Sequence, residues 1–174
     1  MLNTKTLTVK QWVVLMEAMV NEFGKTHSIE SFSDSDIRDF AYGVKANNQL
    51  RDFLLGLPLD LSEAQGWDSE EAVSFCGAML TLIVAHPALT AEYRVPLKAG
   101  MSLFYMEIGN DTEAKKLLDE ILEVEPDYAL ANLLTRTLNL PWQVRGFEQM
   151  RIECHPKVRE RLSEMADEVL ALDN

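Results

Sequence analysis

Apolar residues recur along this chain at the spacing of α-helices, and start and stop signals bound each such run. Thr8 and Gln11 form the pattern of a capping box before the first run, and Gly24 follows its last apolar residue. The apolar residues between these signals share one helical face, and they are Val9, Trp12, Val13, Met16, Met19, Val20 and Phe23. We therefore predict a first helix over residues 9–23.

Further capping signals divide the next part of the chain. Ser33 precedes the apolar stripe of a second helix, and Asn47 precedes a short third helix in "QLRDFLLG". The glycines and the proline of "GLPLDLSEAQGW" indicate a linker after that helix. Asp68 and Glu71 form a capping box before the most apolar run, which we expect to be a buried helix that ends before Pro87.

Prolines set the expected boundaries in the second half of the chain. Pro96 suits the first turn of a helix that continues to Ile108, and Pro126 ends the helix that follows. Pro141 and Pro156 each indicate a further interruption, with a final helix after Pro156. No segment shows the sustained apolar alternation of a strand. The predicted fold is therefore all-α, an irregular bundle of about 7–9 helices.

The linker-like stretch also suggests how the chain is divided. A chain of 174 residues is ordinarily one domain, or one compact unit with a small appendage. We interpret residues 1–57 as an N-terminal helical appendage and residues 67–174 as the main helical body, and one continuous domain is the alternative. If the appendage packs loosely, the apolar stripe of its first helix offers a contact for a homodimer.

Acidic residues strongly outnumber basic ones. The chain has 28 acidic and 16 basic residues, which gives a formal net charge of −12. Because this charge repels phosphate backbones, we expect no direct binding to nucleic acid and favour a partner protein with a basic surface. The alternative explanation is that the acidic surface only keeps the protein soluble.

An acidic cluster around Lys115 and Lys116 is the candidate partner-binding surface. Its residues, with one aromatic candidate, are Glu107, Asp111, Glu113, Asp119, Glu120, Glu123 and Trp142. Carboxylates on one side of a molecule attract a basic partner and speed the encounter, and tryptophan is enriched at interfaces. Trp67 and Phe147 are further aromatic candidates. The alternatives are a solvated outer face for the carboxylates and a place in the core for the aromatic rings.

The chain carries no recognisable catalytic, cofactor or metal motif. His27, His86 and His155 lack the spacing of HExxH, Cys76 and Cys154 form no CxxC pair, and no glycine-rich phosphate loop is present. We therefore predict no enzyme activity, cofactor or metal. Two isolated cysteines favour a reducing compartment, and the first residues lack the apolar core of a signal peptide. Because the longest apolar run is too short to span a bilayer, we expect a cytoplasmic protein without membrane contact.

The middle of the chain places small and large residues at positions typical of a helical hairpin. The relevant residues are Ser102, Tyr105, Gly109, Ala114, Leu118 and Pro126. With these residues, positions of about 95–128 resemble one unit of a tetratricopeptide repeat (TPR), whose two helices pack through such residues. Lys98 stands where a tryptophan is common in that family, and Ile121 where an alanine is usual. The resemblance implies TPR-like packing within an irregular bundle.

A second resemblance covers residues of about 50–140. The order of "LRDFLLG", a long apolar helix near residue 80 and "GNDTEAKKLLDEILEVEPDYALANLLTRTL" is similar to the C-terminal part of an actinobacterial family known only as a domain of unknown function. Members of that family likewise place a long apolar helix before a Gly–Asp turn, an alanine-rich helix, a proline and a Tyr-x-Leu-Ala helix. The resemblance implies a fold and no activity.

Two functional hypotheses follow. The leading one is a non-catalytic helical module for protein–protein interaction, because the packing is repeat-like and no chemical motif is present. The alternative is an acidic inhibitor or nucleic-acid mimic that blocks a basic groove of a nucleic-acid-handling protein, which the small size and the net charge of −12 fit.

Overall fold

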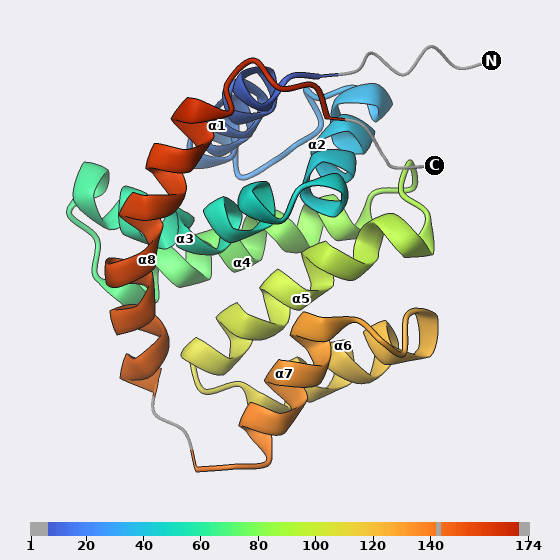
Figure 1. The fold of residues 1–174 in the computed structure, drawn as a ribbon, viewed down its shortest axis with the longest axis vertical. Coiled ribbons are helices and arrows are strands. Elements are labelled where there is room, and N and C mark those ends of the chain that lie inside the picture. Colours follow the sequence, from blue (N-terminus) through green and yellow to red (C-terminus); the bar gives the residue numbers. More distant parts are fainter. Residues whose placement is uncertain (1–6, 142–143, 171–174) are drawn as a thin grey trace.

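The computed structural model describes residues 7–141 and 144–170, which fold into eight α-helices (Figure 1). In chain order these are α1 (Val9–Thr26), α2 (Asp34–Ala46), α3 (Asn48–Gln65), α4 (Ser69–Ala85), α5 (Ala91–Glu107), α6 (Asp111–Val124), α7 (Ala129–Leu138) and α8 (Val144–Glu164). Over the described ranges the only β pairing is one isolated bridge between Thr8 and Val169. The predicted all-α bundle is confirmed.

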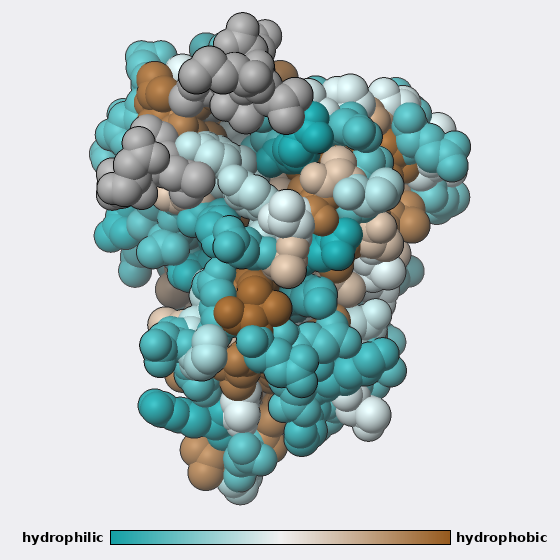
Figure 2. Space-filling model, turned by 90° about the vertical axis from the view of Figure 1, so that its right-hand side faces the viewer, coloured by the Kyte–Doolittle hydropathy of each residue, from teal (hydrophilic) through white to brown (hydrophobic). Residues whose placement is uncertain are grey.

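The outside of the molecule is largely hydrophilic on the side that lies to the right in Figure 1. Figure 2 shows this side, where apolar residues come to the surface in separate spots rather than as one continuous area. In the part of the chain that the structure describes, no helix combines the length and the apolar character that a bilayer crossing requires.

The capping signals of the sequence are found in the structure. At α1 the Thr8 hydroxyl accepts from the Gln11 amide at 3.2 Å, while the Gln11 side chain accepts from the Thr8 amide at 2.9 Å. Asp68 and Glu71 form the same reciprocal pair at α4. The expected stop of α1 after residue 23 is wrong, because the helix continues through Gly24 to Thr26. His27 then ends it in the left-handed conformation, with φ 54°.

Three prolines lie inside helices rather than at their ends, and this corrects the sequence interpretation. The stretch predicted as a linker is part of α3, which runs through Pro58. Helix α5 starts five residues before Pro96, and α8 continues through Pro156. Packing explains the difference, because Pro58 and Pro96 are buried in the core. Pro156 is exposed, so water can reach the carbonyl that lacks a donor there.

One hydrogen bond shows how α5 accommodates its proline. Pro96 has no N–H for the carbonyl of Glu92, four residues earlier. The ammonium of Lys45 on α2 lies 3.5 Å from that carbonyl oxygen and donates to it. A side chain from another helix thus replaces a backbone donor, which a sequence pattern within α5 cannot reveal.

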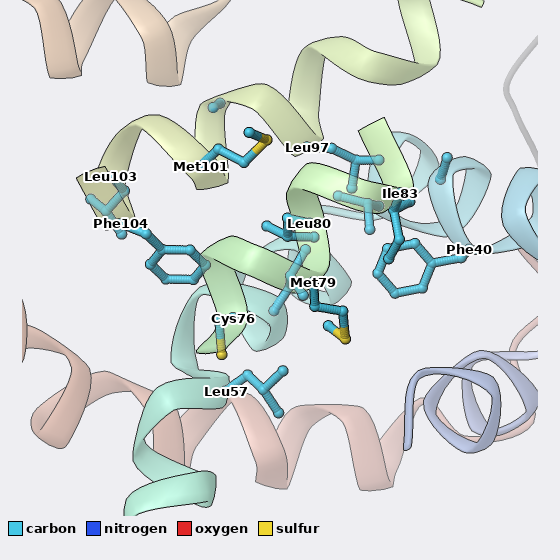
Figure 3. Close-up of a cluster of buried hydrophobic side chains, with 14 of the residues drawn as sticks. Phe40, Leu57, Cys76, Met79, Leu80, Ile83, Leu97, Met101, Leu103 and Phe104 are labelled. Carbon is cyan, nitrogen blue, oxygen red and sulfur yellow. The ribbon is translucent and has the colours of Figure 1, made fainter. Parts of the chain in front are cut away.

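The buried apolar side chains form one cluster to which all eight helices or their flanking segments contribute. Figure 3 shows its centre, where Cys76, Met79, Leu80 and Ile83 of α4 lie among side chains of α2, α3 and α5. The expected boundary after residue 57 falls within α3, and α3 itself supplies buried residues on both sides of that boundary. The helices before and after residue 57 therefore share this core.

The apolar stripe of α1 belongs to the same core. Trp12, Met16, Met19 and Phe23 are all buried, and the Trp12 ring stacks on Phe40 with centroids 5.2 Å apart. The indole N–H of Trp12 also donates to the Phe40 carbonyl at 2.9 Å. These side chains are consequently not at the surface, where the expected homodimer contact would need them.

The segment after α8 returns to the start of α1. The amides of Val9 and Lys10, which have no acceptor within the first turn of α1, donate to the carbonyls of Glu168 and Ala166 at 2.9 and 3.0 Å. The amide of Leu170 donates to the Leu7 carbonyl at 2.8 Å. The two ends of the described chain are thereby joined by backbone hydrogen bonds.

Candidate binding groove between α7 and α8

The acidic residues singled out in the sequence do not form one surface of uncompensated charge. Asp119 pairs with Lys115 at 2.6 Å, and Glu120 pairs with Lys98 at 2.7 Å. Asp111, Glu113 and Glu123 form no ion pair within residues 7–141 and 144–170. Trp142 lies outside the described residues.

Glu107 is buried rather than exposed. Its carboxylate accepts two hydrogen bonds from the guanidinium of Arg151 on α8, one of them at 2.9 Å, and both side chains are less than a tenth exposed. A carboxylate in such a bidentate pair is neutralised and inaccessible. Glu107 is therefore part of the contact between α5 and α8 and is not on an outer acidic face.

The hairpin of α5 and α6 contains the small residues that the sequence analysis placed there. Ser102 and Ala114 are fully buried, Tyr105 is half-buried, and Gly109 takes φ 78° in the turn. A positive φ of this size is the region that glycine adopts without strain. These features describe a closely packed hairpin, and they do not identify a repeat family.

Three polar side chains of α8, Arg151, His155 and Arg159, bind the helix to the bundle. Arg151 also donates from Nε to the Leu55 carbonyl at 2.9 Å, and His155 Nε2 lies 3.0 Å from a carboxylate oxygen of Asp60. Arg159 forms an ion pair with the same Asp60. Because the three residues are spaced by four, they share one face of α8, and this face lies on α3 and on the end of α5.

The apolar side chains of α8 are mostly only partly covered, and Phe147 and Val158 pack against the core without being fully buried. Among the α8 side chains that the structure describes, Leu162 is the only buried apolar one. Met150 is 50% exposed, and Leu133 on the neighbouring α7 is 58% exposed. Exposed apolar side chains gathered on one side of a molecule mark surfaces that take up a ligand or a partner.

Between α7 and α8 these side chains enclose a groove of about 470 Å³. It is lined by Asp52, Leu55, Gly56, Leu103, Leu130, Leu133, Leu134, Thr137, Phe147, Met150, Arg151, Cys154, His155 and Val158. Helices α7 and α8 supply the two walls, and α3 and α5 supply the floor. The lining is predominantly aliphatic and aromatic, so the groove suits an apolar group of a ligand or partner.

The charged side chains and the histidine of the groove each contact another protein group. His155 is 2% exposed, stacks on Phe53 and faces the backbone of Gly56 with Nδ1, which has no hydrogen-bond partner among the described residues. Cys154 is exposed on the wall. Asp52 binds Arg51 through one carboxylate oxygen at 3.0 and 2.8 Å. The histidine is thus a packing element of the α3–α8 contact.

A second cavity of about 590 Å³ lies between α1, α3 and the start of α4. Its lining mixes apolar residues, among them Trp67 and Phe75, with the charged Glu17, Lys25 and Asp60. The Trp67 and Phe75 rings lie 5.2 Å apart, so Trp67 packs on a neighbour in the bundle. Because opposite charges are mixed here, this cavity favours no particular class of ligand.

Burial raises the pKa of two titratable groups outside the groove, the Cys76 thiol and the Tyr128 hydroxyl. Burial raises the pKa of the Cys76 thiol far above its usual range, which makes this cysteine a poor nucleophile at neutral pH. Burial also raises the pKa of the Tyr128 hydroxyl, and the nearby Arg51 opposes that shift. Both groups stay protonated at neutral pH.

Sequence reasoning missed the groove, although it named Phe147 as an aromatic candidate. Leu130, Leu133 and Thr137 follow the i, i+3, i+7 spacing on α7, and Phe147 and Met150 continue the same pattern on α8. That periodicity was the available signal. This periodicity does not show whether the apolar stripes of α7 and α8 pack against each other or leave a groove between them.

Comparison with known proteins gives no indication of function. No protein-family model, no curated protein and no solved structure matches the chain. Over the described residues, no three or more histidine, cysteine or acidic side chains are grouped so that they could hold a metal ion.

Proposed function

We propose that this protein is a non-catalytic helical module that binds another protein through the groove between α7 and α8. The observation that supports the proposal is the open apolar groove, whose walls include Leu133 and Met150, each at least half exposed. Apolar side chains that stay in water raise the free energy of the unbound protein, and a partner that covers them removes this cost.

The polar contacts of α8 support a binding role over a catalytic one. His155 would be the natural proton-transfer group of the groove, but both its nitrogens face protein atoms, Nε2 toward Asp60 and Nδ1 toward Gly56. A general base needs hydrogen-bond reach to its substrate. The groove thus offers apolar contact area and a scaffold, which are what an interaction module requires.

The alternative, an acidic protein that imitates nucleic acid, keeps the net charge of −12 as its support. Three carboxylates of the α6 region, Asp111, Glu113 and Glu123, carry no ion pair in the described part of the chain. If they formed the binding surface, partner binding would weaken steeply with salt and be displaced by an oligonucleotide. Binding through the groove would respond weakly to both.

Three purified variants with an affinity tag test the proposal. Leu133→Asp and Met150→Asp place a charge in the groove, whereas Val14→Asp changes an equally exposed apolar residue, 57% exposed, on α1. Circular dichroism and thermal melting first establish that all three fold like the unchanged protein. A partner identified by mass spectrometry, and then purified, should bind the unchanged protein and the Val14 variant within about twofold.

The two groove variants should bind that partner at least about tenfold more weakly, which corresponds to 1.4 kcal/mol. Equal binding by all three variants would reject the groove as the binding surface. Loss of binding at 0.5 M salt together with equal binding by the groove variants would favour the acidic alternative.

A further inference from the structure

We infer that the occupant of the groove is a short amphipathic helix that carries a basic residue, supplied by a partner protein. This inference rests on the proposed function and specifies the partner. The lining residues recur on α7 and on α8 at helical spacing, so each of these helices turns one face toward the groove. On α7 they are Leu130, Leu133, Leu134 and Thr137, and on α8 they are Phe147, Met150, Arg151, Cys154, His155 and Val158.

The length of the walls limits the length of the occupant. From Leu130 to Thr137 the wall on α7 covers seven residues, about 10 Å at 1.5 Å per residue. From Phe147 to Val158 the wall on α8 covers eleven residues, about 16 Å. A guest helix of about two to three turns spans this distance, with three or four large apolar side chains at i, i+3 or i+4, and i+7.

The backbone chemistry of the groove favours a helix over an extended segment. An extended peptide leaves its amides and carbonyls without partners unless a strand edge or side chains supply them. Both walls here are helices whose backbone groups bond within the helix, and the described residues contain no strand edge for pairing. A helix satisfies its own backbone, so it enters an apolar groove without that loss.

The order of the helices gives the guest a place in the fold. Helices α5, α6 and α7 reverse direction one after another, as Figure 1 shows in the lower half of the molecule. Helix α8 then runs away from this series and lies on α3. A guest helix beside α7 would occupy the position that a next antiparallel helix would take.

Charge determines the polar side of the guest. Among the lining residues that the structure describes, Asp52 is the only acidic one, and its second carboxylate oxygen, Oδ2, accepts no hydrogen bond from any of the described residues. The other charged lining residue, Arg151, is buried against Glu107. With a net charge of −12 on the chain, a lysine or arginine of the guest is attracted to the Asp52 carboxylate.

A display library of random peptides about 16 residues long, selected on the unchanged protein and depleted on Leu133→Asp, tests the inference. We expect enriched sequences to share apolar residues at i, i+3 or i+4, and i+7, and to carry a lysine or arginine. Synthetic copies should become helical on binding by circular dichroism. Asp52→Asn should weaken the binding of these peptides by about threefold or more, and Val14→Asp should weaken it by less than about twofold.

Alkylation of Cys154 supplies an independent readout of where the peptide binds. This thiol is exposed on the α8 wall, so a peptide in the groove should slow its reaction with iodoacetamide about tenfold. Enriched peptides without the apolar pattern, binding without helix formation, or an unchanged alkylation rate would overturn the inference. If the cellular partner still requires Leu133 in that case, the proposed function stands and only the helical occupant is rejected.

Discussion

At the scale of single residues, two glycines mark where a large side chain of one helix lies directly against the backbone of another. A Cβ atom on Gly43 would lie 2.2 Å from the Trp12 ring, and one on Gly56 would lie 1.8 Å from the His155 ring. Both distances are far inside van der Waals contact. These two positions therefore fix how closely α1 approaches α2 and how closely α8 approaches α3.

The first prediction concerns Gly56→Ala. Alanine favours a helix over glycine by about 1 kcal/mol, but the clash with the His155 ring should outweigh this and destabilise the protein by about 1–3 kcal/mol. Gly146 on α8 is the matched control, because a Cβ there meets nothing within 4 Å. Gly146→Ala should stabilise by up to about 1 kcal/mol. Urea unfolding measures both, and equal effects would contradict the close approach at Gly56.

The second prediction uses the two cysteines. A disulfide reagent at neutral pH should label the exposed Cys154 quickly, and the buried Cys76 only when the protein unfolds. Counting labelled thiols by mass spectrometry in native buffer and in urea checks this. Rapid labelling of both thiols in native buffer would show that the core around Cys76 opens readily.

The third prediction concerns alkaline pH. Burial raises the folded-state pKa of Cys76, whereas the unfolded chain has an ordinary thiol pKa of about 8.5. Stability from this group is complete below that value and falls by about 1.4 kcal/mol per pH unit above it, because only the unfolded chain loses the proton. The Cys76→Ala variant has no thiol at this position, so its stability lacks this dependence on pH. The stability difference between the two proteins, measured in urea from pH 7 to 10, should therefore shrink as pH rises.

At the scale of elements, α8 combines charged contacts to α3 and α5 with apolar side chains that are mostly only partly covered. Arg151, His155 and Arg159 face α3 and α5, and Leu162 is the single buried apolar residue among the α8 side chains that the structure describes. Removing two charges from water is unfavourable unless their geometry is good. The Arg151–Glu107 pair has such a geometry, because the guanidinium donates to both carboxylate oxygens of Glu107 and, from Nε, to the Leu55 carbonyl.

The fourth prediction separates the two partners of that pair. Arg151→Met leaves the Glu107 carboxylate buried without a counter-charge, which should destabilise the protein by about 3–5 kcal/mol. Adding Glu107→Leu removes the buried charge, so the double variant should be more stable than the Arg151 variant. Arg159→Ala, at a more exposed pair, should change stability by no more than about 1 kcal/mol. Urea unfolding of the two single variants and the double variant measures the coupling energy between Arg151 and Glu107. Additive effects of the two substitutions would contradict a direct interaction between these side chains.

The same pair shows which parts of this structure could be predicted from the sequence. Capping boxes and apolar stripes depend on residues a few positions apart, and the helix starts at Val9, Asp34 and Ser69 followed from them. Glu107 was instead expected on the surface, because its partner Arg151 lies 44 residues away along the chain. The groove was missed for a related reason. Its walls are visible as stripes, but their separation depends on how α8 crosses α3.

Three prolines show where the prediction of helix boundaries from the sequence fails. Pro58, Pro96 and Pro156 each suggested a boundary, and each lies within a helix. The loss of one backbone hydrogen bond is local, whereas the burial of Leu57 and Leu61 on either side of Pro58 is set by the bundle. Tertiary burial is absent from a local pattern, so the boundaries could not be read from it.

At the scale of the whole molecule, the described chain closes on itself. The helices before and after residue 57 share one apolar cluster, and the segment after α8 supplies acceptors for the first amides of α1. Unfolding of α1 should therefore release residues 165–170 as well, since each holds the other. Such reciprocal support makes a small helical protein more cooperative than its separate hairpins.

The fifth prediction tests this closure with two neighbouring residues. Leu170 is buried, with 4% of its surface exposed, and its amide donates to the Leu7 carbonyl, whereas Val169 is 59% exposed. Leu170→Ala should destabilise the protein by about 2 kcal/mol or more, because a buried leucine loses its apolar contacts and leaves a cavity. Val169→Ala should change stability by less than about 0.5 kcal/mol.

Hydrogen exchange distinguishes closure from ordinary core packing in the Leu170 variant. If the C-terminal segment holds the start of α1, the amides of Val9 and Lys10 should lose protection more than the amides of α4, because they donate to the carbonyls of Glu168 and Ala166. A uniform loss of protection over α1 and α4 would mean that Leu170 contributes only to global stability. Unchanged protection at Val9 and Lys10 would show that α1 does not need this segment.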